Sequence, residues 1–504
     1  MRVLPSERAS EGNRAVHYGD TMRVMLESKA WIALSVLFVL TLGSTCAGKP
    51  PITAGETSAV MKDLDPYLID ALYGSDRDGQ TGRFGEEGAM VDLLTEPAFV
   101  ALVEQHNLKL FNGPMIGDIR PTSAKFWIRT AGEADVQIQI GDMTSNQVTT
   151  SPSGDYTAVM TVDGLEPFTA YTYTVMIDGE KVERESFTFK TAPAAGQRVS
   201  FDVAFGSGAR YVPSNEYAWR NMAESNPLAY LGLGDNVYID VMNRRGAQRL
   251  FYYRRGLSPA WSELTSSVAI YAVWDDHDMA IDDSAGGAGL DAPWKVPNWT
   301  VFRQNWNNPY YGGGDKVPGT WHSFSLGDVE FFMTDGRFYR EKKDRTMLGP
   351  DQKKWLLKAL AESKAKFKVL ASGTMWSDGA DKDGKDSWAG RWARGERNEI
   401  FDWINQKKIN GVILISGDRH RSDIWKVDRP AGYPLYEFVS AKVTNEHTHQ
   451  TFPNAIWSYN EGNFWGQLSF NLQLSDPVMT FRCVDISGKV VKEYPLKLSE
   501  LSHR

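Results

Sequence analysis

The chain has 504 residues, which is too long for one hydrophobic core and predicts two or three domains. Hydrophobic residues at 42% and charged residues at 23% indicate an ordinary folded protein. A formal net charge of −8 without a basic stripe argues against specific recognition of nucleic acid. Two cysteines can build neither a disulfide framework nor a zinc cluster, so any metal must be held by oxygen and imidazole.

Residues 1–47 are predicted to be an export signal or a membrane anchor. Lys29 precedes an apolar run, residues 30–42, which is short for a membrane span and ends in small residues. Three alternatives stay open: signal-peptidase cleavage near Ala47, lipid attachment at Cys46 as in bacterial lipoproteins, or a retained single-pass anchor. Each one predicts an exported protein, periplasmic, cell-surface or secreted, whose only membrane contact is this segment.

Residues 48–110 are predicted to be a polar, interrupted segment, and residues 111–196 a small all-β domain. In the latter, apolar and polar side chains alternate with a period of two, and Asp178-Gly179 is a hairpin turn. Residues 164–173 resemble the Leu-x-Pro…Tyr-x-Tyr stretch of fibronectin type III domains, which implies a β-sandwich. The predicted strands are residues 124–129, 136–140, 158–162, 171–177 and 186–190.

Residues 197–504 are predicted to form an α/β domain, because apolar strands now alternate with helical segments. One helix is expected from residue 350 to residue 363, and residues 468–484 are expected to be antiparallel sheet. The other predicted strands of this domain are residues 200–205, 228–233, 268–272, 329–334, 368–372 and 411–416.

Polar side chains that can bind metal follow several of these strands at once. They are Asp235, Asp276 with His277, Asp335, and Asp418 with His420. The carboxyl ends of parallel strands share one edge of a sheet, so these residues are expected to meet in space. The alternative for residues 275–278 is a solvated acidic turn, and Gly-Asp is common turn chemistry. Four such strand ends in one domain favour a metal-dependent site.

This chemistry suits the hydrolysis of a phosphate ester. Two cations that share a bridging carboxylate lower the pKa of a bound water and neutralise charge on the transferring phosphoryl group. Arg337 would hold phosphate oxygens bidentately. An imidazole beside the metals would protonate the leaving alkoxide.

Six segments, in this order along the chain, resemble the motifs of PhoD-type alkaline phosphatases of the calcineurin-like metallophosphoesterase superfamily. They are residues 234–238, 274–278, 335–340, 348–356, 386–390 and 417–420. The resemblance implies a four-layer α/β/β/α metallophosphatase domain behind the β-sandwich. It also implies an exported enzyme for phosphate monoesters, often diesters too, that uses calcium together with ferric iron.

The resemblance implies a metal-binding role for five residues of this chain. Asp235 would bridge the two metals, and Asp276, Asp418 and His420 would complete the ligand set. Tyr238 would be a phenolate ligand to ferric iron, with an ordinary buried tyrosine as the alternative.

Three further residues are implied to act on the substrate. His277 would be the general acid, and Asp335 and Arg337 would lie beside the phosphate. The remaining carboxylates of the acidic stretch, Asp275 and Asp278, are expected to fix the loop.

Two positions depart from the family's pattern. Gly208 stands in Gly206-Ser207-Gly208, where the family usually has a cysteine ligand, so the iron site either binds a different metal, takes a water or is degraded. Asp282-Asp283 stands where many relatives have Asn-Asp, and the hypothesis is that Asp282 adds charge at the metal site.

Three functions are compatible with the sequence. The favoured one is an exported phosphatase or phosphodiesterase that attacks a phosphate-ester substrate through a metal-activated water. The second is a degenerate, non-catalytic binding protein of the same fold, which Gly208 favours and the surviving site residues oppose. The third is a cell-surface adhesion module carried by the β-sandwich, for which only the predicted fold speaks.

Overall fold

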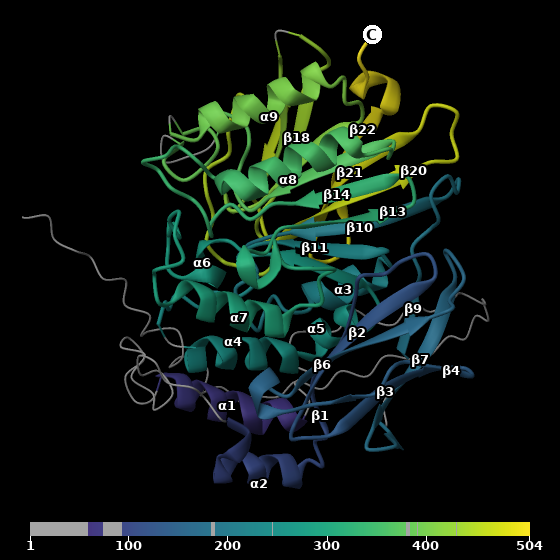
Figure 1. The fold of residues 1–504 in the computed structure, drawn as a ribbon, viewed down its shortest axis with the longest axis vertical. Helices are drawn as coiled ribbons and strands as arrows, with labels where there is room; N and C mark the ends of the chain where they lie inside the picture. Colours follow the sequence, from purple (N-terminus) through teal and green to yellow (C-terminus); the bar gives the residue numbers. More distant parts are fainter. Residues whose placement is uncertain are drawn as a thin grey trace, which may run out of the picture. The chain divides into compact units, whose positions relative to one another are not determined.

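A computed structural model describes residues 59–73, 93–182, 187–243, 245–379, 384–390, 392–429 and 431–504 (Figure 1). All of them belong to the unit that begins at Ile52. The predicted export segment, including Cys46, lies outside the described residues. Within the described part of the chain, no helix is both long and apolar enough to cross a membrane.

A small all-β domain, residues 110–190, consists of two antiparallel sheets. Its strands are β1 (Leu110–Gly117), β2 (Ser123–Thr130), β3 (Asp135–Ile140), β4 (Met143–Thr144), β5 (Val148–Thr149), β6 (Thr157–Asp163), β7 (Ala170–Ile177), β8 (Glu180–Lys181) and β9 (Phe187–Lys190). One sheet has the order β1-β2-β6, and the other is built around β3 and β7. Phe126 of β2 contacts Tyr173 of β7 and Phe189 of β9, with ring centroids 4.8 and 5.3 Å apart, so the sheets pack face to face. The predicted strands and the hairpin turn are confirmed.

Two larger sheets follow. The six-stranded sheet has the order β12-β11-β10-β20-β21-β22, and the seven-stranded sheet has the order β13-β14-β15-β16-β18-β17-β19. The first contains β10 (Ser200–Gly206), β11 (Ala229–Leu233), β12 (Ala269–Val273), β20 (Phe464–Asn471), β21 (Val478–Asp485) and β22 (Val490–Lys497). The second contains β13 (His322–Leu326), β14 (Val329–Met333), β15 (Phe367–Ser372), β16 (Val412–Ser416), β17 (Ser422–Val427), β18 (Leu435–Ser440) and β19 (Trp457–Tyr459).

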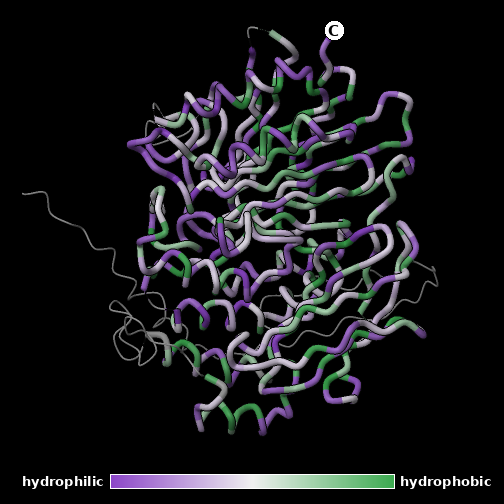
Figure 2. The backbone as a smooth tube through the Cα atoms, in the orientation of Figure 1, coloured by the Kyte–Doolittle hydropathy of each residue, from purple (hydrophilic) through white to green (hydrophobic). Residues whose placement is uncertain are grey.

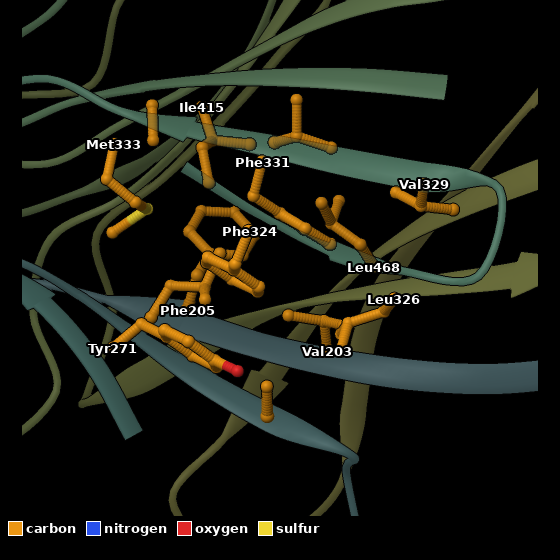
Figure 3. Close-up of a cluster of buried hydrophobic side chains, with 14 of the residues drawn as sticks. Val203, Phe205, Tyr271, Phe324, Leu326, Val329, Phe331, Met333, Ile415 and Leu468 are labelled. Atoms are coloured by element: carbon orange, nitrogen blue, oxygen red, sulfur yellow. The ribbon is translucent and has the colours of Figure 1, made fainter. Parts of the chain in front are cut away.

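The core lies between these two sheets (Figure 3). Tyr271 of β12 stacks on Phe324 of β13 with ring centroids 3.5 Å apart, and Phe438 of β18 stacks on Phe481 of β21 at 4.6 Å. Every residue of β11, β12 and β16 is buried, as expected for parallel strands covered on both faces. Figure 2 shows the strands carrying long hydrophobic stretches.

Helices cover the outer face of each sheet. Leu356 and Leu360 of α8 (Gly349–Glu362) and Ile400 and Ile404 of α9 (Arg394–Gln406) join the core on the seven-stranded side. On the other side, α3 (Ala218–Glu224), α4 (Arg245–Leu257), α5 (Pro259–Thr265) and α7 (Lys295–Asn305) pack on β10, β11 and β12. The mixed α/β fold is therefore confirmed, with helices, two sheets and helices as successive layers (Figure 1).

Residues 48–110 contain helices that the sequence analysis missed. They are α1 (Ala59–Tyr73), the 3₁₀ turn η1 (Leu93–Thr95) and α2 (Pro97–Gln105). Leu64, Leu68 and Phe99 are buried, and Phe99 meets Phe111 of β1 with ring centroids 5.2 Å apart. α1 has 15 residues with Pro66 inside it and α2 has 9, so these helices depend on packing against the β-domain and α4 for their stability.

A buried histidine in β13 makes the fold sensitive to acid. His322 donates from Nδ1 to the carbonyl oxygen of Thr320 at 2.9 Å, and burial lowers its pKa to about 4 from an ordinary 6.5. The unfolded chain therefore takes up the proton first, and this group's stabilisation, complete above pH 6.5, is lost as the pH falls toward 4. We expect about 2 kcal/mol of unfolding free energy to be lost between about pH 7.5 and about pH 5.

His322→Gln, which keeps an amide donor for Thr320, is expected to lose this part of the pH dependence. Urea unfolding of both proteins at the two pH values measures it. An unchanged difference between the two pH values in the variant would assign the acid sensitivity to other groups.

Candidate metal centre

Five of the predicted site residues meet beyond the carboxyl ends of β11, β12 and β16. Asp235, Asp276 and His277 each offer a ligand atom within 4.8 Å of the others. The hydroxyl of Tyr238 donates to Oδ2 of Asp235 at 3.0 Å and lies 3.1 Å from Nε2 of His420. The short helix α6 (Asp276–Met279) starts directly after β12 and presents two of these side chains. The expected convergence of strand ends is thus observed.

The backbone at this site is unusual. Asp235, Asp418 and His420 have φ angles of 51°, 70° and 42°, which lie in the left-handed region. This region costs a residue with a side chain about 1–2 kcal/mol, and Asp and His are among the few types found there. The strain turns each loop sharply at the end of a buried strand, so the side chains face one another.

The carboxylates fit a bound cation. Oδ1 of Asp235 and Oδ1 of Asp276 are both buried without a hydrogen-bond donor among the described residues, and the nearest cation to the second is Arg337 at 3.4 Å. Burial, together with the neighbouring carboxylates, raises the pKa of Asp235 well above its ordinary value. Buried oxygens that lack donors are costly unless a cation balances them, and hard cations prefer such oxygens.

His277 is held as a cation by carboxylates. Its Nδ1 lies 2.5 Å from Oδ1 of Asp240, and its ring stacks on Tyr238 with centroids 4.3 Å apart. Burial alone would lower the pKa of His277, but Asp235, Asp240 and Asp276 raise it to about 11. Asp240 was not predicted from the sequence. It lies two residues after Tyr238, and this spacing is the feature that could have indicated it.

Asp418 lies at the edge of the site. Its Oδ2 accepts a hydrogen bond from Oγ1 of Thr374 at 2.8 Å and pairs with Arg419 at 3.1 Å. Its backbone N–H donates to Oγ of Ser207 at 2.8 Å, which ties it to the loop after β10. Burial raises the pKa of this carboxyl, with Arg419 opposing. Among the described residues, Asp418 joins none of the groups of three ligand atoms.

The prediction for Asp282 is corrected by the structure. Its side chain is 71% exposed and reaches only to 3.7 Å from Nε2 of His277. The chain turns at Asp283, where φ is 55°, and Asp283 instead faces inward. Its backbone N–H donates to Oδ2 of Asp276 at 2.6 Å, and its carboxylate forms a second group of three with Asp276 and Asp386.

The prediction for Arg337 is also corrected. The side chain is fully buried and donates to both oxygens of Asp275 and to both oxygens of Asp386, the latter at 2.9 and 2.8 Å. Its N–H groups are therefore directed at carboxylates of the protein and not at a substrate phosphate. Arg337 fixes the two acidic loops that flank Asp276.

Asp335 likewise binds groups of the protein itself. It is fully buried, and its Oδ1 accepts the backbone N–H groups of Arg337 and Phe338 at 3.0 and 2.9 Å. Its Oδ2 accepts the backbone N–H of Thr320 at 2.9 Å. Asp335 closes the turn after β14, and both of its oxygens are taken up by backbone N–H groups, which corrects the predicted role beside the phosphate. Asp278 has a similar role, accepting the backbone N–H groups of Asn236 and Val237, as expected.

Two histidines near the site were missed. His447 and His449 follow β18 and place their rings 4.9 and 5.2 Å from the ring of His420, measured between centroids. The three residues form a further group of ligand atoms within 4.8 Å. The spacing His-x-His could have indicated them. They were not predicted because the preceding strand, β18, ends several residues earlier, at Ser440.

Comparisons with known proteins agree with this geometry. A family model described as PhoD-like phosphatase matches residues 203–461, just over half of the chain. A domain family of unknown function, DUF7800, matches residues 107–193. Alkaline phosphatase D of Bacillus subtilis (strain 168) is 26% identical over 324 residues. That match covers 54% of each protein, so the chain spans about half the length of this curated relative.

Two solved structures share the fold. One is described as the structure of PhoD and has a TM-score of 0.64 at 17% identity, covering 76% of this chain and 88% of that one. The other is a purple acid phosphatase from yellow lupin (Lupinus luteus) seeds, with a TM-score of 0.54 at 14% identity, covering 77% and 74%. At these identities the likeness shows the fold alone. The family match, the fold and the converging strand ends lead to one conclusion: the chain belongs to the PhoD-like phosphatase family.

Proposed function

We propose that the protein is an exported, metal-dependent phosphatase that hydrolyses phosphate monoesters, and diesters where the second substituent fits. The observation that carries this proposal is the meeting of Asp235 and Asp276 with Tyr238 and His420 at the strand ends, where Oδ1 of both aspartates is buried without a hydrogen-bond donor among the described residues. The name of the Bacillus relative, alkaline phosphatase D, supports the reaction class. Export rests on the sequence of residues 1–47, and the β-domain is proposed to be fibronectin type III-like.

The metal ligands are proposed to be Asp235, Tyr238, Asp276, Asp418 and His420. Asp235 is the bridging candidate, because one of its oxygens meets Tyr238 and the other is buried without a donor among the described residues. Asp276 lies beside the carboxylate of Asp283, and such oxygens suit calcium. Bound cations neutralise charge on the phosphoryl group and make a hydrolytic nucleophile available at neutral pH. Ferric iron is the proposed partner of calcium, and Tyr238 and His420 would hold it.

His277 is proposed to protonate the leaving oxygen of the ester. Asp240 occupies Nδ1, so the proton to be transferred sits on Nε2. Burial alone would lower the pKa of the ring, but the hydrogen bond to Asp240 raises it, which favours the protonated form that a general acid needs. Stacking on Tyr238 and the contact with Asp240 fix the orientation of the ring. The ring is partly exposed, so a substrate can reach it.

The test is hydrolysis of a chromogenic phosphate ester by the full chain, with calcium and ferric iron and after chelation. We expect activity that chelation removes, and a loss of about 10²–10⁴-fold in kcat for His277→Ala with its metal content unchanged. His503→Ala is the matched control, because His503 bonds Asn410 and takes no part in the site. Loss of metal in His277→Ala would make this residue a ligand and not the acid.

A non-catalytic binding protein of the same fold is the second candidate, because Gly208 gives a metal no side chain. Metal binding without hydrolysis under any of these conditions would favour it over the phosphatase.

A further inference from the structure

We propose that His420, His447 and His449 form a binding site for a borderline divalent cation of the Zn²⁺ type. Their ligand atoms lie within 4.8 Å of one another, and the three rings are 4.9 to 5.2 Å apart between centroids. One cation bound by all three nitrogens needs only small movements, because zinc–nitrogen distances are about 2.0–2.1 Å. His420 is buried and the other two lie toward solvent, so an ion can enter from the surface.

Gly208 allows the loop that carries His447 and His449 to pack closely against the loop after β10. Its φ is 65°, and a Cβ there would lie 2.3 Å from the carbonyl oxygen of Ala441. The carbonyl oxygen of Gly208 accepts backbone N–H groups of Thr444 and Asn445 at 3.2 and 3.0 Å. The chain after β18 thus fills the space that a side chain at position 208 would take. The same segment then delivers two imidazoles to His420.

The loop is held by side-chain amides. The backbone N–H of His447 donates to Oδ1 of Asn445 at 3.1 Å, and Nδ2 of Asn460 donates to the carbonyl oxygen of His449 at 2.8 Å. Nδ2 of Asn463 donates to the carbonyl oxygen of Asn445, also at 2.8 Å. Metal ligands bind better when their backbone is fixed beforehand, and these bonds supply that support.

The donor set selects the type of ion. His420 is the buried member of the group and lies at its inner end. Its Nε2 faces the hydroxyl of Tyr238, and its Nδ1 is buried without a hydrogen-bond partner among the described residues. Three imidazoles favour zinc, copper or nickel over calcium, and leave a fourth position open.

The carboxylates of Asp276 and Asp283 have the opposite preference, for hard ions. The two ends of the site therefore select different metals. A role for the histidine site in catalysis rests on the proposed function. The binding of a cation by the three histidines is independent of that function.

The test is zinc binding by the full chain after chelation, followed by calorimetry and metal analysis. We expect the double variant His447→Ala/His449→Ala to lose one equivalent of Zn²⁺, or to bind it at least about 100-fold more weakly. Losing a residue that merely orients a metal ligand costs about 10–100-fold, so a larger loss indicates direct ligands. His503→Ala, a surface histidine paired with Asn410, is expected to bind zinc as the unchanged chain does.

A Co²⁺-loaded sample gives a second readout, since the intensity and position of its visible absorption bands depend on the number and arrangement of its ligands. We expect these bands in the unchanged chain and in His503→Ala, and weakened bands in His449→Gln. Equal zinc stoichiometry and affinity in the double variant would overturn the proposal. Unchanged zinc binding with a raised KM would overturn it too, and would assign the two histidines to substrate contact. Zinc bound through the histidines with no hydrolysis anywhere would support the site and count against the phosphatase alone.

Discussion

Asp235→Asn is expected to reduce hydrolysis of a chromogenic phosphate ester by at least about 10³-fold and to lower the amount of bound metal. Asp235 is the buried residue that connects Asp276 and His277 on one side to Tyr238 on the other. Its replacement removes a charge that cations need, and metal stabilisation of the transition state is worth several kcal/mol, with each tenfold in rate equal to about 1.4 kcal/mol. Asn has the same shape and also tolerates the φ of 51°, so the fold is expected to survive.

Asp178→Asn is the matched control. This aspartate has the same φ of 51° but lies in the hairpin turn of the β-domain. Activity and metal analysis of both variants, with circular dichroism to verify folding, separate a site effect from a backbone effect. Full activity in Asp235→Asn would mean that the metal centre is assigned to the wrong residues.

Arg337→Met is expected to destabilise the protein by about 3–5 kcal/mol. The guanidinium is fully buried between Asp275 and Asp386, and each carboxylate receives two of its N–H groups. Among the described residues, Asp275 is then left without an ion pair, and Asp386 keeps the pairs with Arg340 and Arg419. Urea unfolding followed by fluorescence measures the loss.

The double variant Arg337→Met/Asp275→Asn is expected to recover part of that stability, because the uncompensated charge is then removed as well. Arg337→Lys keeps one charge but cannot bind two carboxylates bidentately, so an intermediate value is expected. A variant Arg337→Met that is as stable as the unchanged chain, but has a raised KM, would restore the substrate role that the sequence suggested.

Much of the fold could be predicted from the sequence because its central strands are buried on both faces. Such strands are short apolar runs, and β11, β12 and β16 all fit that pattern. The meeting of Asp235 with Asp276 followed from the same pattern, since parallel strands end at one edge. The helices before the β-domain were not found in this way, because they are short and one of them contains Pro66.

The errors at the site have a different cause. Whether Asp282 or Asp283 faces inward depends on a turn of one residue, and sequence spacing does not resolve that. Arg337 suits a phosphate and a carboxylate equally well, so its role depends on Asp386, which only the folded chain brings near. His447 and His449 were missed because their position depends on backbone bonds to Gly208 and on no local pattern.

The left-handed backbone at Asp235 and Asp418 also constrains how this protein can evolve. Few residue types accept that conformation, and among those that an aspartate codon reaches by a single base change, asparagine is the one with nearly the same shape as aspartate. That substitution would preserve the turn, and with it the fold, while removing a negative charge from the site. Lineages of such proteins can therefore lose chemistry before they lose structure, and a shape-preserving descendant would be free to take up binding as its only task.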